Sequence, residues 1–109
     1  MNNKYFVVLC SCPDEATAGR LARTLVDERL AGCVSRLPGV TSTYRWEGRV
    51  QEDPEVLLVI KTTGERLATL SARIETLHPY EVPEIIAVEI GAGSERYLGW
   101  LGQTVAAAD

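Results

Sequence analysis

Side chains that could bind a metal ion occur at two places in this sequence. Cys10 and Cys12 lie two residues apart, so a strand running through them would place both thiols on one face. The only histidine, His78, opens the segment 78–84. Thiolate and imidazole together suit copper or zinc. Each signal is weak alone, because free cysteine is often a small core residue and a histidine in a last helical turn often caps the helix.

The segment 78–84 is predicted to be rigid. It contains two prolines and two glutamates and lies directly before the apolar run 85–88. Each proline fixes its own φ and disfavours helical geometry in the residue before it, so we expect His78 and Val82 to be extended. A stiff polar segment beside an apolar strand indicates a binding surface, because little conformational entropy is lost on engagement.

Several familiar catalytic patterns do not occur in the sequence. The cysteines have no recognisable partner for nucleophilic catalysis, and neither a G-x-S-x-G nor a P-loop pattern occurs. The glycines at 91 and 93 lack the third glycine of a dinucleotide fingerprint. We therefore predict that the protein is not an enzyme.

The remaining cysteine and a group of acidic residues are expected to have structural roles only. Cys33 is expected in the core, and the acidic residues Glu52, Asp53 and Glu55 are expected in a solvated loop.

Composition narrows the class of protein. The 109 residues suffice for one domain, and we expect a single domain spanning 1–109. The net charge of −4 argues against a nucleic-acid partner, which would favour a basic surface. No apolar run approaches the roughly 18 residues of a transmembrane helix, so we expect no membrane span. Three cysteines cannot all pair within the chain, and a reduced, cytoplasmic protein fits best.

Hydrophobic periodicity predicts the element order β-α-β-β-α-β-α. We expect strands at 5–12, at 33–46 with an interruption at 38–39, and at 85–90. Between the last two, residues 49–51 return from the turn and lead into a buried strand at 56–60. The first expected helix runs from 13 to about 30, and Gly32 closes it. The second runs from a capping box at Thr62 and Glu65 to Leu77. The third begins after Ser94, which is a good N-cap residue. This order is the split βαβ arrangement of ferredoxin-like α+β folds, with two helices on one face of an antiparallel sheet.

The central hairpin is unusually long for such a fold. Residues 33–46 would span about 45 Å if fully extended, whereas a domain of this size has a radius of gyration near 13 Å. Glu47 and Gly48 are a two-residue turn candidate. The hairpin must therefore overhang its own core, and it carries Tyr44 and Trp46 on one face. We expect neighbouring subunits to cover these rings.

Several motifs together resemble one known family. The matching segments, in chain order, are 20–22, 28–34, 38–42, 44–48, 60–63, 77–80, 82–84 and 97–101. They are similar to the CutA divalent-cation tolerance family and cover nearly the whole chain. The resemblance implies a ferredoxin-like subunit in a tight homotrimer, cytoplasmic in bacteria, with an architecture similar to PII-type signalling trimers. It also implies a link to copper and other divalent cations.

The resemblance carries two metal ligands onto this chain. The copper-binding pattern of the family matches Cys10, near the end of the first strand, and His78, before Pro-Tyr. Some members have a second histidine just before that one, where this chain has Leu77. Leu77 also completes the apolar stripe of its helix and is expected to face the core. Cys12 is a candidate substitute thiolate, which the resemblance does not supply.

Two functions from different classes follow. The first is a metal-binding trimer in copper tolerance, with Cys10 and His78 as the copper ligands. The second is a PII-like signalling or interaction module that holds a small molecule or protein partner in clefts between subunits. Tyr80, Glu84, Lys61 and Trp46 would then line the cleft. In a simpler alternative, Tyr80 only packs against the neighbouring subunit and Glu84 pairs with Lys61 or an arginine.

Overall fold

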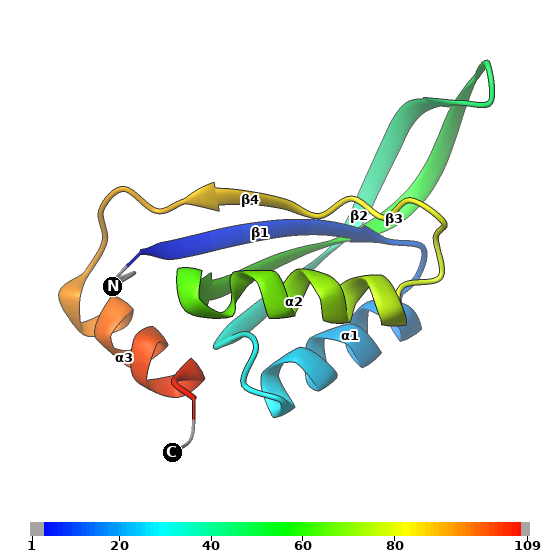
Figure 1. Cartoon of the computed structure of the whole chain (residues 1–109). Coiled ribbons are helices and arrows are strands. Elements are labelled where there is room, and N and C mark those ends of the chain that lie inside the picture. The colour runs from blue at the N-terminus through cyan, green and yellow to red at the C-terminus, as the bar shows by residue number, and fades with distance from the viewer. Residues whose placement is uncertain (1–3, 108–109) are drawn as a thin grey trace.

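The computed structural model of this protein describes residues 4–107 (Figure 1). Its elements follow the predicted order. The strands are β1 (Tyr5–Cys12), β2 (Cys33–Trp46), β3 (Arg49–Thr63) and β4 (Ile86–Glu89). The helices are α1 (Glu15–Asp27), α2 (Gly64–Leu77) and α3 (Glu95–Val105). Among the described residues, no helix is both long enough and apolar enough to cross a membrane.

One face of the sheet is covered by α1 and α2, and most of the other face is open. The strands pair antiparallel in the order β2-β3-β1-β4. Figure 1 shows α1 and α2 below the sheet, with α3 at the end where β1 begins. Alternate residues of β1 and β3, including Val8, Cys10, Leu58 and Ile60, are buried in the core that these helices complete. This arrangement confirms the ferredoxin-like α+β fold.

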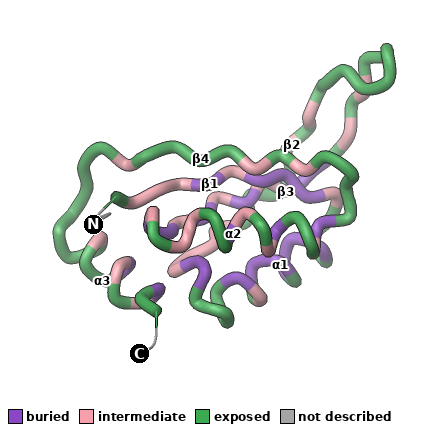
Figure 2. The backbone as a smooth tube through the Cα atoms, in the orientation of Figure 1, coloured by how far each residue is buried: buried purple, intermediate pink, exposed green. Residues whose placement is uncertain are grey.

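The β2–β3 hairpin projects beyond the rest of the domain, as its length predicts (Figure 1). The molecule measures 46 × 26 × 23 Å, and its radius of gyration of 14.5 Å exceeds the ~13 Å of a compact chain of this length. Glu47 and Gly48 form the predicted turn, with φ of 51° and 78°. Tyr44 and Trp46 remain 41% exposed, and Figure 2 shows the projecting part as exposed or half-buried.

The predicted interruptions of the hairpin strands are local irregularities. At residues 38–39 the register shifts between Leu37 and Val40, and β2 continues on both sides. Pro54 lies opposite Thr41 within β3. The pairing of β3 with β1 starts only at Val56. Before that point β3 has one unpaired edge, where a residue without an N–H is tolerated.

The C-terminal end of α1 differs from the prediction. The helix lies entirely after Pro13 and ends at Asp27, earlier than expected, and Arg29 takes the left-handed conformation with φ of 60°. The predicted closure at Gly32 is therefore wrong. A Cβ at Gly32 would lie only 2.5 Å from Cδ1 of the buried Leu101. Glycine is needed there because α3 approaches the backbone closely.

The predicted capping box at the start of α2 is also wrong. The N-cap residue is Thr63, which makes no side-chain capping bond. Thr62 is instead fully buried and donates its hydroxyl to the Leu30 carbonyl at 2.7 Å, so it ties the end of β3 to the chain after α1. The predicted cap at Ser94 is confirmed, because its hydroxyl accepts a backbone N–H from the first turn of α3 at 3.2 Å.

The last strand is shorter and more exposed than predicted. β4 covers four residues rather than 85–90, and all four are exposed. Ile86 and Val88 lie opposite Leu9 and Val7 of β1, and 51% and 54% of their surface is accessible. The apolar run indicated a buried strand, but within one chain β4 is a sheet edge whose outer side chains face the open side of the sheet.

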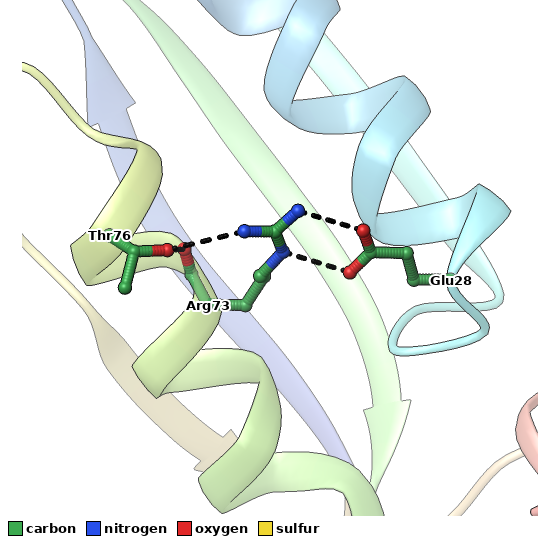
Figure 3. A network of polar contacts seen from close by, with 3 residues as sticks. All are labelled: Glu28, Arg73 and Thr76. Atoms are coloured by element: carbon green, nitrogen blue, oxygen red, sulfur yellow. Dashed lines mark hydrogen bonds and ion pairs between the residues drawn. The ribbon is translucent and has the colours of Figure 1, made fainter.

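An ion pair joins the end of α1 to α2 (Figure 3). The guanidinium of Arg73 donates two hydrogen bonds, at 2.9 and 2.8 Å, to the carboxylate of Glu28, and a third, at 3.5 Å, to the hydroxyl of Thr76. The bonds from Arg73 lower the pKa of Glu28 below its ordinary value. The pair is partly exposed and screened by solvent, so it contributes little to the free energy of folding.

Candidate metal site

Three buried side chains meet where β1 and α2 end. Cys10 and Cys12 point to the helix-covered side because they are two residues apart on β1. Pro79 prevents α2 from continuing, so His78 is extended, as predicted, with φ of −78° and ψ of 138°. The ligand atoms of these three residues all lie within 4.8 Å of one another. The structure thus brings both predicted ligands together and adds the second thiol.

The ring of His78 is held by two hydrogen bonds. Its Nε2 lies 2.8 Å from the carbonyl oxygen of Ser11, and the backbone N–H of Tyr80 donates to Nδ1 at 3.1 Å. A carbonyl only accepts and an amide N–H only donates, so Nε2 carries the proton and Nδ1 the lone pair. The helix-cap alternative applies to the backbone, whose N–H bonds to Ile74. The ring itself turns to β1.

The two thiols form an electrostatically coupled pair. A hydrogen bond from the Cys10 thiol lowers the pKa of Cys12, against the opposing effect of burial. The same bond and the burial of the site raise the pKa of Cys10, and the nearby carboxylates of Glu84 and Glu55 add to this rise. The pair therefore favours one thiolate, on Cys12, that accepts the proton of its neighbour.

The donor set fits a thiophilic metal ion. Two sulfurs bound to one ion at about 2.3 Å can be at most ~4.6 Å apart, and the observed cluster spans no more than 4.8 Å. Little movement of Cys10 or Cys12 is therefore needed. Leu77, which stands where some family members have a second histidine, is half-buried and packs against the core, as expected.

A groove of about 650 Å³ lies on the opposite, open side of the same strand end. It separates the base of the hairpin from the segment that follows α2. Of the residues predicted for a cleft between subunits, Tyr80, Glu84 and Trp46 line this groove of the single chain. The other lining residues are Ser11, Ser42, Thr43, Tyr44, Glu55, Pro79, Glu81 and Val82. Ser11 thus faces this groove, while the thiols on either side of it face the core.

The solvated loop predicted for Glu52, Asp53 and Glu55 is wrong, because all three belong to β3. Glu55 departs furthest from the prediction: it is 8% exposed and accepts a hydrogen bond of 2.5 Å from the hydroxyl of Tyr80. Burial and this bond raise the pKa of Tyr80 above its ordinary value. The alternation that buries Val56 on one side places Glu55 on the other, and this could have been read from the sequence. The Tyr80 hydroxyl that bonds to it comes from a distant segment, which the pattern does not specify.

Lys61 and Cys33 lie away from the groove. They are paired across β2 and β3 on the open face, and the Lys61 ammonium is 3.8 Å from Cys33 Sγ and 3.5 Å from Ser35 Oγ. Lys61 therefore neither lines the groove nor pairs with Glu84, whose carboxylate accepts a hydrogen bond of 3.4 Å from Ser11. The core position predicted for Cys33 is also wrong: the residue is half-buried on the face opposite α1 and α2, where the side chains of Lys61 and of Tyr97 from α3 contact it.

The fold and the cluster together define a ferredoxin-like α+β protein with a buried thiol–imidazole site. The chain belongs to the CutA1 divalent ion tolerance protein family, whose model matches residues 6–104. Over 95 residues it is 52% identical to the divalent-cation tolerance protein CutA of Thermus thermophilus. This match covers 87% of this chain and 92% of that protein.

Two further relatives show the same likeness. The protein named "CutA, chloroplastic" from Arabidopsis thaliana is 45% identical over 95 residues. The match covers 87% of this chain but only 52% of the plant protein, so the chain spans about half of that relative. The crystal structure of CutA from Xylella fastidiosa superimposes with a TM-score of 0.91 at 40% identity, and the match covers 93% of this chain and 97% of that chain.

Proposed function

We propose that this protein acts in divalent-cation tolerance by binding copper at the cluster of Cys10, Cys12 and His78. The observation that carries the proposal is the convergence of three soft or borderline ligand atoms within 4.8 Å at a buried position. Sulfur and imidazole ligands favour copper over the harder divalent cations. The proposed role is one of binding rather than catalysis, since both nitrogens of the His78 ring are hydrogen-bonded to backbone groups instead of activating a thiol.

Copper binding is expected to depend on this cluster and to leave Cys33 uninvolved. Cys10→Ser and His78→Ala should each weaken binding, whereas Cys33→Ser, the matched control on the opposite face of the sheet, should bind like the wild type. The measurement is the saturable rise in melting temperature of reduced protein on adding copper(I), with zinc in parallel. Affinity should fall as pH falls, because protons compete for the ligands. Equal binding by the Cys10 and Cys33 variants would contradict the proposal.

We also infer that three copies assemble through the open face and the projecting hairpin. Five large apolar side chains on that side are between 41% and 54% exposed in the single chain: Leu37, Tyr44, Trp46, Ile86 and Val88. Isolated soluble proteins rarely leave so extended an apolar surface in water. The trimer itself is what the family resemblance implies. Native mass spectrometry of the purified protein tests it by counting subunits and bound metal in one spectrum.

A cytoplasmic location is part of the same proposal. The described chain has three free cysteines, two of them buried beside each other. A metal site of thiolates requires a compartment that keeps thiols reduced. Fractionation of the native host, with antibody detection of the protein in the cytoplasmic fraction, checks this inference.

The groove supports a second candidate function, that of a PII-like module which binds a small molecule or a protein partner. Its wall combines aromatic rings with carboxylates from Glu55, Glu81 and Glu84. An acidic lining favours a cationic or neutral ligand over a free nucleotide or another anion. Segment 79–84 would form the rigid side of the site, held to the domain by the bond between Tyr80 and Glu55.

Tyr80→Phe separates a binding groove from a packing surface. The variant keeps the ring but removes the hydroxyl that donates to Glu55, so the assembly should remain intact while a ligand bound through this network is lost. Calorimetry against a panel of metals, amines and nucleotides provides the measurement. Unchanged binding to every member of the panel would make Tyr80 a packing residue only.

A further inference from the structure

The hydrogen bonds of His78 restrict what its ring can do. Nε2 donates to the Ser11 carbonyl, and Nδ1 accepts from the Tyr80 N–H. Both nitrogens of the neutral ring are therefore engaged, and neither offers a lone pair without breaking a bond. The site is 7% exposed at His78, so water has little access to replace a lost partner. Coordination through this ring would thus carry a local structural cost.

The two thiols are hydrogen-bonded to each other, and a metal ion that replaces their protons removes this bond without leaving a backbone group unpaired. Cys10 and Cys12 are fully buried and point into the same space, and neither thiol is held by a close bond to the backbone. Cys10 Sγ approaches the Ser11 carbonyl oxygen only at the long distance of 4.0 Å. Two sulfur ligands are thus available at one point while the imidazole is in use elsewhere.

We propose that the metal site is a two-thiolate site for monovalent copper, formed by Cys10 and Cys12, in which His78 is a positioning residue rather than a ligand. The inference rests on the proposed copper-binding function and assigns the roles within that cluster. It departs from the ligand pair that the family resemblance implies, because it exchanges the histidine for Cys12.

The number and kind of donors favour this ion. Zinc is almost always held by four ligands at structural sites, and the cluster of Cys10, Cys12 and His78 is the one grouping of three candidate ligands found among residues 4–107. Copper(I) is selected by soft thiolates. A single positive charge between two thiolates would also leave the site negative overall, which limits the affinity for further anions near Glu55 and Glu84.

His78 positions the thiol pair through Ser11. The carbonyl that it binds belongs to the residue between Cys10 and Cys12, so this bond fixes the local twist of β1 that points both thiols to the same side. Its second bond orients Tyr80 and thereby the segment that covers the strand end. Supporting residues of this kind commonly change metal affinity by about 10–100-fold.

The test compares variants by competition for copper(I) against a chromophoric chelator, under anaerobic reducing conditions. Cys10→Ser and Cys12→Ser should each lose more than ~100-fold in affinity, beyond the usual range for supporting residues. His78→Gln should lose less than ~10-fold, because a glutamine amide can donate to Ser11 and accept from Tyr80 but is a much poorer ligand. Cys12→Ala provides a second thiol deletion if the serine variant folds poorly.

X-ray absorption of the copper-loaded wild type provides a readout that needs no variant. The spectrum should be fitted by sulfur neighbours alone, and His78→Gln should leave it unchanged. A nitrogen neighbour that disappears in His78→Gln, or a loss in that variant as large as that in Cys10→Ser, would overturn the two-thiolate assignment while leaving copper binding intact. Absence of saturable copper(I) binding by the wild type would instead refute the proposed function, and the assignment with it.

Discussion

Trp46→Ala is expected to shift the protein from the proposed trimer to smaller species at micromolar concentration. The ring lies near the tip of a hairpin that extends past its own core and is 41% exposed in the single chain. Buried aromatic residues dominate interface energies, and their truncation commonly costs about 2–4 kcal/mol. Each ~1.4 kcal/mol corresponds to a tenfold change in an association constant, so a loss of about 30-fold or more is expected per interface.

Sedimentation velocity over a concentration series measures this effect. Arg20→Ala is the control, because it removes an exposed charge from α1, on the side of the sheet away from the hairpin rings. It should sediment like the wild type. If Trp46→Ala remains trimeric at all concentrations, or the wild type sediments as a folded monomer of about 12 kDa, the hairpin is not an assembly element.

Leu70→Ala is expected to cost about 3 kcal/mol of folding free energy. Leu70 belongs to the apolar stripe of α2 and is fully buried against the sheet. Removing its side chain loses apolar burial and leaves a cavity, and such changes typically cost about 2–5 kcal/mol. Its neighbour Thr69 is exposed on the same helix, so Thr69→Ala should change stability by less than ~0.5 kcal/mol.

Chemical denaturation at one fixed protein concentration provides the measurement, because assembly makes stability depend on concentration. A cost below ~1 kcal/mol for Leu70→Ala would contradict the prediction and would mean that the apolar face of α2 contributes little to the core.

The order of elements could be predicted from the sequence because it depends on local patterns. Period-two and period-3.6 apolar spacing identified the strands and helices, Glu47 and Gly48 marked the turn, and the proline after His78 ended α2. These features act within a few residues, so the chain alone determines them. The same locality made Cys10 and Cys12 neighbours on one face of β1.

Burial and partner choice were decided by the tertiary structure. Glu55 is buried because Tyr80, which lies 25 residues later, covers it. Cys33 and Lys61 lie on the face of the sheet opposite α1 and α2, and Ile86 and Val88 of β4 are exposed on the same face. The His78 ring binds Ser11, 67 residues away. Such contacts depend on how distant elements meet, and hydrophobic patterning specifies which residues are apolar without specifying which surface will cover them.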